Sequence, residues 1–200
     1  MNKHILATAL LSAGILLINA AQAQVQDLST WTKAGLTTVA GTTATLATSN
    51  SGESTAFSTS SLGGTYGSSL STTFQLLAGS TISFDWLFGT NDYSPYNDFA
   101  AFKLNDTVIK LADVVSLGNT GGSRSSTGWK TFSYNVAADS NSTLSFIVSN
   151  VGDNNVTSSL QLANVNVAAV PEPETYALMA TGLLGLLFSR KKKVAVQAAA

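Results

Sequence analysis

The feature that most constrains the fold is a strict alternation of apolar and polar residues in the middle of the chain. Between positions 81 and 88 every second residue is large and apolar, and the same spacing recurs at 131–136 and 143–149. Successive side chains of a β-strand point to opposite faces, so this pattern predicts strands with one face in a core and one in water. The apolar positions are Ile82, Phe84, Trp86, Phe88, Phe132, Tyr134, Val136, Leu144, Phe146 and Val148.

Weaker strand patterns fill much of the remaining chain, and no helical periodicity of useful length interrupts them between positions 24 and 167. Many short strands without intervening helices are typical of all-β folds, and we expect an antiparallel, jelly-roll-like β-sandwich. A β-barrel is the alternative, and the sequence does not give the strand order. The additional strands are expected at Leu36–Ala40, Thr43–Thr48, Ser54–Thr59, Leu70–Leu76, Phe99–Leu104, Thr107–Leu111 and Ser158–Val167.

Three connections between these strands have recognisable turn chemistry. Asn105 and Asp106 tolerate positive φ, so they predict a tight hairpin between the strands on either side. The Gly- and Ser-rich segment 118–128 is expected to be a long flexible loop. In the last strand the apolar phase flips near Ala163 and Asn164, which predicts a bulge or a bend there.

The N-terminal segment has the layout of an export signal. Lys3 and His4 precede an apolar stretch from 5 to 18, and Ala21 and Ala23 flank Gln22 in a small-x-small cleavage pattern. We therefore expect residues 1–23 to be a signal peptide that is cut after Ala23 and residues 24–169 to be the folded domain.

The C-terminal segment 170–200 contains a Pro-Glu-Pro triplet, an uncharged apolar run and a basic cluster, in that order. The run is shorter than the roughly 20 residues of a full membrane span, and the cations would stay on the cytoplasmic side. We expect a short transmembrane helix; an amphipathic core helix with a solvated basic end is the alternative. The triplet is Pro171, Glu172 and Pro173, and the cluster is Arg190, Lys191, Lys192 and Lys193.

This arrangement resembles the PEP-CTERM sorting signal of Gram-negative bacteria that make exopolysaccharide and biofilm. The resemblance implies an exosortase-type membrane peptidase as partner, transient anchoring in the inner membrane, cleavage near the triplet and delivery to the cell surface or extracellular matrix. Five short motifs lie in the middle of the chain, at Phe84–Phe88, Asn91–Tyr93, Tyr96–Phe99, Lys110–Val114 and Gly128–Phe132. Through them, roughly residues 80–167 also resemble an uncharacterised domain that PEP-CTERM proteins often carry. This second resemblance supports a sandwich and implies no activity.

The composition between the two terminal segments excludes several functions. Residues 24–170 carry five basic and nine acidic side chains, and this acidic balance argues against nucleic acid as a partner. The sole histidine is His4, in the expected signal peptide, and the chain has no cysteine. Ser-His-Asp triads, Cys-His pairs and His- or Cys-based metal sites are therefore excluded from the domain, and we expect no catalytic residues and no enzyme.

The densest group of polar and aromatic residues lies at 89–99, between two expected strands, and a second group lies at 152–155. Carboxylate and amide oxygens suit calcium, and tyrosine rings stack on sugar faces. No cofactor is required, and calcium is the one candidate; the alternative is that these residues only form turns. The candidate metal ligands are Asn91, Asp92, Asp98 and Asp153, and the candidate sugar-binding residues are Tyr93 and Tyr96.

We therefore expect an exported structural or adhesive protein of the cell surface or exopolysaccharide matrix, which binds carbohydrate or calcium. The rival function is a glycosidase or lyase that modifies the matrix polysaccharide, which needs two carboxyl groups facing each other across a cleft. Asp85 is a candidate for such a pair by residue type alone, as are the three aspartates of the candidate metal set. Its place on the polar face of a strand favours a solvated or paired surface group instead.

The three tryptophans are expected to differ in role. Trp86 shares the apolar phase of its strand and is expected in the core, and Trp129 is assigned to the core as well. Trp31 lies at the entry to the domain, and its pattern does not decide between core and surface.

Overall fold

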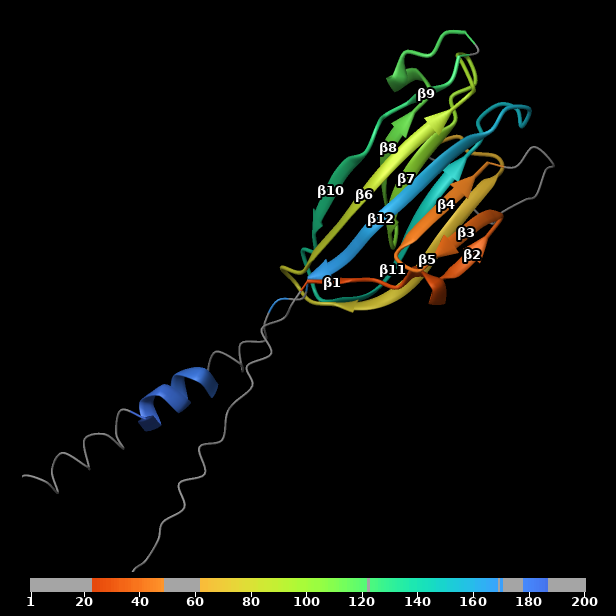
Figure 1. Ribbon diagram of the computed structural model, residues 1–200. Helices are drawn as coiled ribbons and strands as arrows, with labels where there is room; N and C mark the ends of the chain where they lie inside the picture. The colour runs from red at the N-terminus through yellow and green to blue at the C-terminus, as the bar shows by residue number, and fades with distance from the viewer. Residues whose placement is uncertain (1–22, 49–61, 122, 169, 171–177, 187–200) are drawn as a thin grey trace, which may run out of the picture. The chain divides into compact units, whose positions relative to one another are not determined.

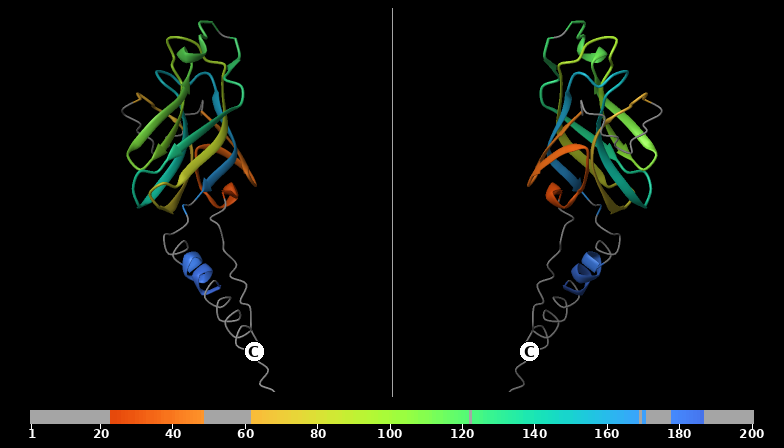
Figure 2. Two further views of the ribbon diagram at one scale, coloured as in Figure 1. Left: turned by 90° about the vertical axis from the view of Figure 1, so that its left-hand side faces the viewer. Right: turned by 90° about the vertical axis from the view of Figure 1, so that its right-hand side faces the viewer.

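The computed structural model describes residues 23–48, 62–121, 123–168, 170 and 178–186. Residues 21–170 form one compact unit of two antiparallel sheets packed face to face, as the ribbon shows from three sides (Figure 1, Figure 2). The expected antiparallel, jelly-roll-like sandwich is confirmed. The strands are β1 Gln24–Val25, β2 Thr32–Ala34, β3 Leu36–Ala40, β4 Thr43–Ala47, β5 Gly67–Leu76, β6 Thr81–Thr90, β7 Phe99–Leu104, β8 Thr107–Asp113, β9 Ser125–Ser126, β10 Lys130–Asn135, β11 Ser140–Ser149 and β12 Ser158–Ala168, and the 3₁₀ turns are η1 Leu28–Thr30 and η2 Val115–Leu117.

The two sheets differ in width. The seven-stranded sheet has the order β10-β6-β12-β4-β3, with β1 added to β12 and β9 added to β6. The five-stranded sheet has the order β2-β5-β11-β7-β8. Strands β6, β7, β11 and β12 therefore occupy inner places, and the loops that leave their ends at Thr90, Phe99, Ser149 and Ser158 are rigidly supported.

The core is organised around the inward stripe of β6. Phe84 is 1 % exposed, and its ring centroid lies 4.7 Å from that of Phe146, 5.1 Å from that of Phe132 and 5.5 Å from that of Phe102. Phe102 and Phe146 belong to the opposite sheet, so the cluster joins both layers. Such aromatic contacts add to the stabilisation from apolar burial.

Most predicted strands are found close to their expected bounds. The hairpin prediction is confirmed, because β7 and β8 pair across Asn105, whose φ is +51°. The short strands β1, β2 and β9 were not predicted, and β9 lies inside the segment 118–128 that was expected to be flexible. The expected strand Ser54–Thr59 lies outside the described residues.

The bulge in β12 is also confirmed. The register between β12 and β6 shifts between Ala163 and Asn166, and Asn164 has a φ of +52°. The Asn164 side-chain amide donates to Oδ2 of Asp85 at 2.7 Å, and the Thr131 hydroxyl donates to Oδ1 at 2.6 Å. The bonds from Thr131 and Asn164 lower the pKa of Asp85, so this carboxylate is the paired surface group that was expected.

Residues 178–186 form a helix in the second compact unit, which is separate from the sandwich. Its large apolar side chains are exposed, among them Leu178, Leu183 and Leu186. Within the described parts of the chain, no helix is long and apolar enough to span a bilayer. The expected transmembrane segment extends beyond this helix into residues that are not described and stays a prediction, as does the signal peptide.

Phe84→Ala tests the aromatic cluster. Removing this ring should lower the free energy of unfolding by about 3–5 kcal/mol, because three ring contacts are lost and the surrounding sheets cannot close the cavity. The measurement is urea unfolding of the full chain in mild detergent. Val115→Ala, at a side chain that is 57 % exposed, is the control and should change the value by less than about 0.5 kcal/mol. Equal effects of the two substitutions would contradict this core.

Candidate functional site

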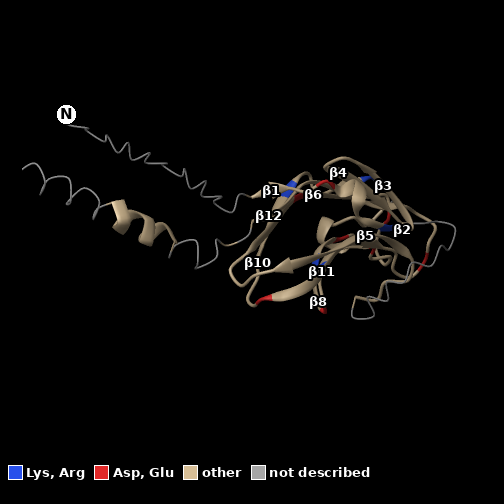
Figure 3. Ribbon diagram, turned by 90° about the horizontal axis from the view of Figure 1, so that it is seen from below, with Lys and Arg blue, Asp and Glu red and all other residues tan. Residues whose placement is uncertain are grey.

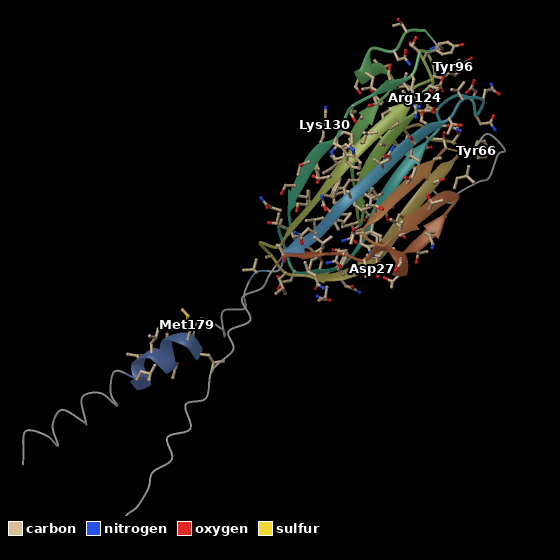
Figure 4. The ribbon with its side chains drawn as sticks, in the orientation of Figure 1. Asp27, Tyr66, Tyr96, Arg124, Lys130 and Met179 are labelled. Atoms are coloured by element: carbon tan, nitrogen blue, oxygen red, sulfur yellow. The ribbon has the colours of Figure 1, made fainter. Side chains whose placement is uncertain are left out.

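The candidate site lies at the end of the sandwich where β6 stops and β7 starts. The connecting segment 91–98, called here the tyrosine loop, contacts the turn 150–157 between β11 and β12 and the turn after β8. Figure 4 labels Tyr96 at this end and Asp27 at the opposite end of the sandwich. The loop is fastened on both sides, because Asn91 N–H donates to Thr157 O at 3.4 Å and Val115 N–H donates to Asn97 Oδ1 at 2.9 Å.

Asp92 is buried at the start of the tyrosine loop, with 1 % of its surface exposed. Its Oδ1 accepts the backbone N–H of Tyr93 at 2.8 Å. Its Oδ2 is also buried and has no hydrogen-bond partner among the described residues. Burial raises the pKa of Asp92, the bond from Tyr93 opposes the rise, and the nearby charge of Asp153 adds to it.

Asp98 is completely buried at the other end of the loop. Its Oδ1 accepts the backbone N–H of Val151 at 3.0 Å, and its Oδ2 accepts the hydroxyl of Ser158 at 2.7 Å. Burial raises the pKa of Asp98 to about 7; the bonds from Ser158 and Val151 oppose this, and the charges of Asp92 and Asp153 add to it. The three aspartates thus lie close enough to repel one another, which their spacing along the chain did not predict.

A pair of buried hydroxyls connects the Asp98 carboxylate to the backbone N–H of Asp92. The Ser158 hydroxyl lies 2.8 Å from that of Thr90, and Thr90 Oγ1 accepts the backbone N–H of Asp92 at 2.8 Å. The sequence analysis missed Thr90 and Ser158. The sequence did contain a signal for both residues. Thr90 lies two residues after the inward-facing Phe88, and Ser158 lies two residues before the inward-facing Leu160, so the alternation predicts that both hydroxyls face the core.

The remaining candidate metal ligands are less enclosed. Asn91 is exposed. Asp153 is partly exposed, and its carboxylate accepts hydrogen bonds from the backbone N–H and the side-chain amide of Asn155. Within the described ranges, no three acidic, histidine or cysteine side chains are grouped closely enough to hold a metal ion. The ion pair found in the same ranges joins Lys110 to Asp113, and none of the three aspartates of the site takes part in one. The ribbon in Figure 3 shows how few positions of the sandwich are occupied by lysine, arginine, aspartate or glutamate.

The two tyrosines of the loop form one unit. Their rings meet edge to face with centroids 6.0 Å apart, and Tyr93 is 37 % exposed while Tyr96 is half-buried. The ring of Tyr96 packs on Gly152, where an added Cβ would lie 3.3 Å from Cδ1 of the ring. Gly152 also has a φ of +93°, which favours glycine. The exposed ring of Tyr93 is therefore supported on its edge by a ring that itself packs on the turn 150–157.

The tryptophans divide between core and surface. Trp86 lies in the core as predicted, and Trp31, which the sequence left undecided, is buried against Phe146. The prediction for Trp129 was wrong, because this side chain is 54 % exposed. Trp129 shares the outward phase of Thr131, while Lys130 takes the inward phase and places its ammonium 5.9 Å from the centroid of Trp86.

The remaining predicted site residues lie outside the described residues. They comprise Ala21 of the signal cleavage pattern, the Pro171–Glu172–Pro173 triplet and the basic cluster from Arg190 to Lys193. Ala23, the other residue of the cleavage pattern, is described and exposed just before β1.

Comparison with known proteins identifies the C-terminal segment. Residues 169–192 match the family model of the PEP-CTERM protein-sorting motif, which confirms the resemblance read from the sequence. The motif implies processing by an exosortase and sorting of an exported protein to the cell surface or the extracellular space. No curated protein matches the sequence.

Two solved structures of CBM proteins are similar in fold. One is TmCBM61 in complex with β-1,4-galactotriose, with 11 % identity and a TM-score of 0.37, covering 72 % of this chain and 90 % of that one. The other is described as "CBM4 structure and function", with 12 % identity and a TM-score of 0.30, covering 70 % of this chain and 79 % of that one.

Titration of Asp98 predicts an unusual pH dependence in buffer free of divalent ions. The folded chain holds this proton with a pKa of about 7, against 3.8 for an ordinary aspartate. The stabilisation of the folded state that comes from protonated Asp98 is therefore fully present below about pH 4 and is lost as the pH rises through 7. From pH 5 to 8 the free energy of unfolding should fall by roughly 2–3 kcal/mol.

Urea unfolding of the full chain at pH 5, 6, 7 and 8 measures this fall, with Asp98→Asn as the variant that cannot titrate. The one histidine of the sequence, His4, is present in both proteins, so the difference between them isolates the titration of Asp98. Most of the fall should be missing in the variant. The same slope in both proteins would show that Asp98 does not titrate near neutrality.

Proposed function

We propose that this protein is exported to the cell surface or the exopolysaccharide matrix, has a structural or adhesive role, and binds carbohydrate at the tyrosine loop. The sorting motif at 169–192 supports the destination. The observation that supports binding is the exposed ring of Tyr93, held by Tyr96 at one end of a rigid sandwich. A role for nucleic acid is not proposed, because the domain is acidic.

The tyrosine pair has the properties of a sugar-stacking surface. A tyrosine ring offers a broad apolar face to the C–H groups of a sugar, and its hydroxyl can donate or accept a hydrogen bond. Because Tyr96 is seated on Gly152, ordering Tyr93 on binding costs little entropy. Asn91 and Ser94 are exposed beside it and carry uncharged groups that match sugar hydroxyls.

We propose a non-catalytic role in preference to a glycosidase or lyase. Two carboxyl groups of a glycosidase must reach the scissile bond from both sides. Asp92 and Asp98 do lie near each other, and a carboxyl that titrates near 7 is a familiar general acid. Both are buried, however, with 1 % and 0 % of their surfaces exposed, and this counts against direct contact with a polysaccharide.

The proposed route to the matrix passes through the inner membrane. The apolar run after Pro173, followed by the basic cluster 190–193, would hold the chain there transiently, with an exosortase as partner. Cleavage near the Pro-Glu-Pro triplet would then release the domain to the surface or matrix.

Tyr93→Ala tests the sugar site. Loss of the stacking ring should weaken binding of the full chain to the producer's own exopolysaccharide roughly two- to twelvefold. This range corresponds to about 0.5–1.5 kcal/mol for an aromatic contact. The measurement is co-sedimentation over a range of polysaccharide concentrations. The protein should stay folded, since the ring is exposed.

Trp129→Ala serves as the comparison, because it removes another exposed aromatic ring from the edge strand β10. Retention should not change in this variant. If Trp129→Ala loses retention while Tyr93→Ala keeps it, the sugar site is not at the tyrosine loop.

Replacing Pro171, Glu172 and Pro173 together by alanine tests sorting. In the native host the variant should accumulate uncut in the membrane fraction, while the wild type loses its C-terminal segment. Mass spectrometry of the C-terminus and fractionation give the result. Replacement of Val194 and Val196, beyond the basic cluster, is the control, and equal processing of the triplet variant and the wild type would exclude recognition of the triplet.

A further inference from the structure

Two buried carboxylates at one end of the sandwich have no cation among the described groups that contact them. Asp92 and Asp98 accept hydrogen bonds from backbone N–H groups and from a serine hydroxyl, all of which are neutral. Removing a carboxylate from water is costly unless a positive charge compensates it. The ion pair of the described residues, between Lys110 and Asp113, is formed elsewhere.

One atom in this cluster is left without a partner. Oδ2 of Asp92 is buried and accepts no hydrogen bond from the described residues, although the side chain is 1 % exposed. The backbone N–H of Asp92 donates to Thr90 Oγ1 at 2.8 Å, the hydroxyls of Thr90 and Ser158 lie 2.8 Å apart, and the Ser158 hydroxyl donates to Asp98 Oδ2 at 2.7 Å. The side chains joined here therefore offer oxygen atoms only, from two carboxylates and two hydroxyls.

We propose that this cluster binds a calcium ion, with Asp92 and Asp98 as its charged ligands, and that the ion fastens the tyrosine loop to the turn 150–157. The hydroxyls of Thr90 and Ser158 are further ligand candidates, and backbone carbonyls or water would complete the shell. Calcium takes six to eight oxygen atoms in flexible geometry, including carboxylates and neutral oxygens. Magnesium is less suited, because it keeps its water and demands a regular octahedron.

Asp153 contributes negative charge to the proposed calcium site and is not required as a ligand of the ion. No three acidic side chains are grouped for metal binding within the described ranges, so the site rests on two carboxylates and neutral oxygens. Asp153 is near enough to repel both carboxylates, which increases the attraction of the site for a cation. Its side chain is partly exposed and bonded to Asn155, so its removal should weaken binding less than removal of Asp92.

Calcium at this place would couple the tyrosine loop to the turn 150–157, two segments that are far apart in the sequence. Asp98 already accepts from Val151 and Ser158, at the two ends of the turn that carries Gly152. Tyr96 rests on that same glycine. This inference is independent of the proposed sugar site, since it concerns the stability of the loop whatever the loop binds.

The test is thermal unfolding of the full chain in mild detergent, first with EGTA and then with calcium up to about 10 mM. Extracellular calcium modules bind with dissociation constants of roughly 10⁻⁴–10⁻³ M. At about tenfold above the dissociation constant, Tm should rise by about 3–6 °C. Sodium chloride of equal ionic strength should give no such rise, and isothermal titration calorimetry should give one ion per chain.

Asp92→Asn distinguishes a calcium ligand from an ordinary structural aspartate. In EGTA this variant should be at least as stable as the wild type, because a buried charge without a counter-ion is removed. It should no longer respond to calcium. Asp106→Asn, the same change in the exposed β7–β8 turn, should keep the full response, and so should Tyr93→Ala, which separates this result from any failure of sugar binding.

Three outcomes overturn the proposal. They are a wild type whose Tm does not change with calcium, an Asp92→Asn variant that keeps the response, and an equal response to sodium chloride. If Asp92→Asn does not fold, Asp98→Asn and calorimetry on the wild type decide instead, and binding of no calcium by the wild type would refute the site.

Discussion

The packing of one strand's inward stripe on the opposite sheet is the interaction on which the rest of the molecule depends. Side chains of β6 alternate without exception from Thr81 to Thr90, and its aromatic members join both layers. This contact fixes which face of β6 is inside and, through hydrogen-bonded pairing, the faces of β10 and β12 as well. A slip by one residue would place four large apolar side chains in water, so the register is strongly determined.

The candidate site continues the inward-facing stripe of β6 with polar instead of apolar side chains. After Phe88 the next inward residue is Thr90, and on β12 Ser158 precedes Leu160 in the same phase. The core therefore ends in hydroxyl groups instead of apolar ones, and the loop that follows places the backbone N–H of Asp92 on one of them and the carboxylate of Asp98 on the other. Rigid strands thus hold a polar cluster that would be unstable in a mobile loop, which is the usual division between scaffold and site.

The local sequence pattern was sufficient to predict much of the fold but little of the candidate site. Leu36–Ala40 and Phe99–Leu104 were predicted with their observed bounds, and the bulge near Asn164 was visible as a phase change. The strands β1 and β9 have two residues each and no periodicity to detect. Trp129 was misassigned because its residue type was given more weight than its phase.

The site could not be predicted because it depends on contacts between distant segments. Asp98 accepts from Ser158, 60 residues later, and nothing in either loop indicates its partner. Burial of Asp92 is equally invisible, since Asn, Asp and Pro are the ordinary residues of exposed turns. The candidate residues could therefore be named from the sequence, whereas their burial and their mutual distances required the three-dimensional structure.

The place of β12 in the sheet has a mechanical consequence. This last strand lies between β6 and β4 and also pairs with β1, so it is hydrogen-bonded along both edges. A pull on the chain from beyond residue 168 would run along the strand axis and strain these bonds together rather than one after another. Shear of this kind is resisted far better than peeling of an edge strand, so β12 is well placed to bear a force applied through the chain that follows it.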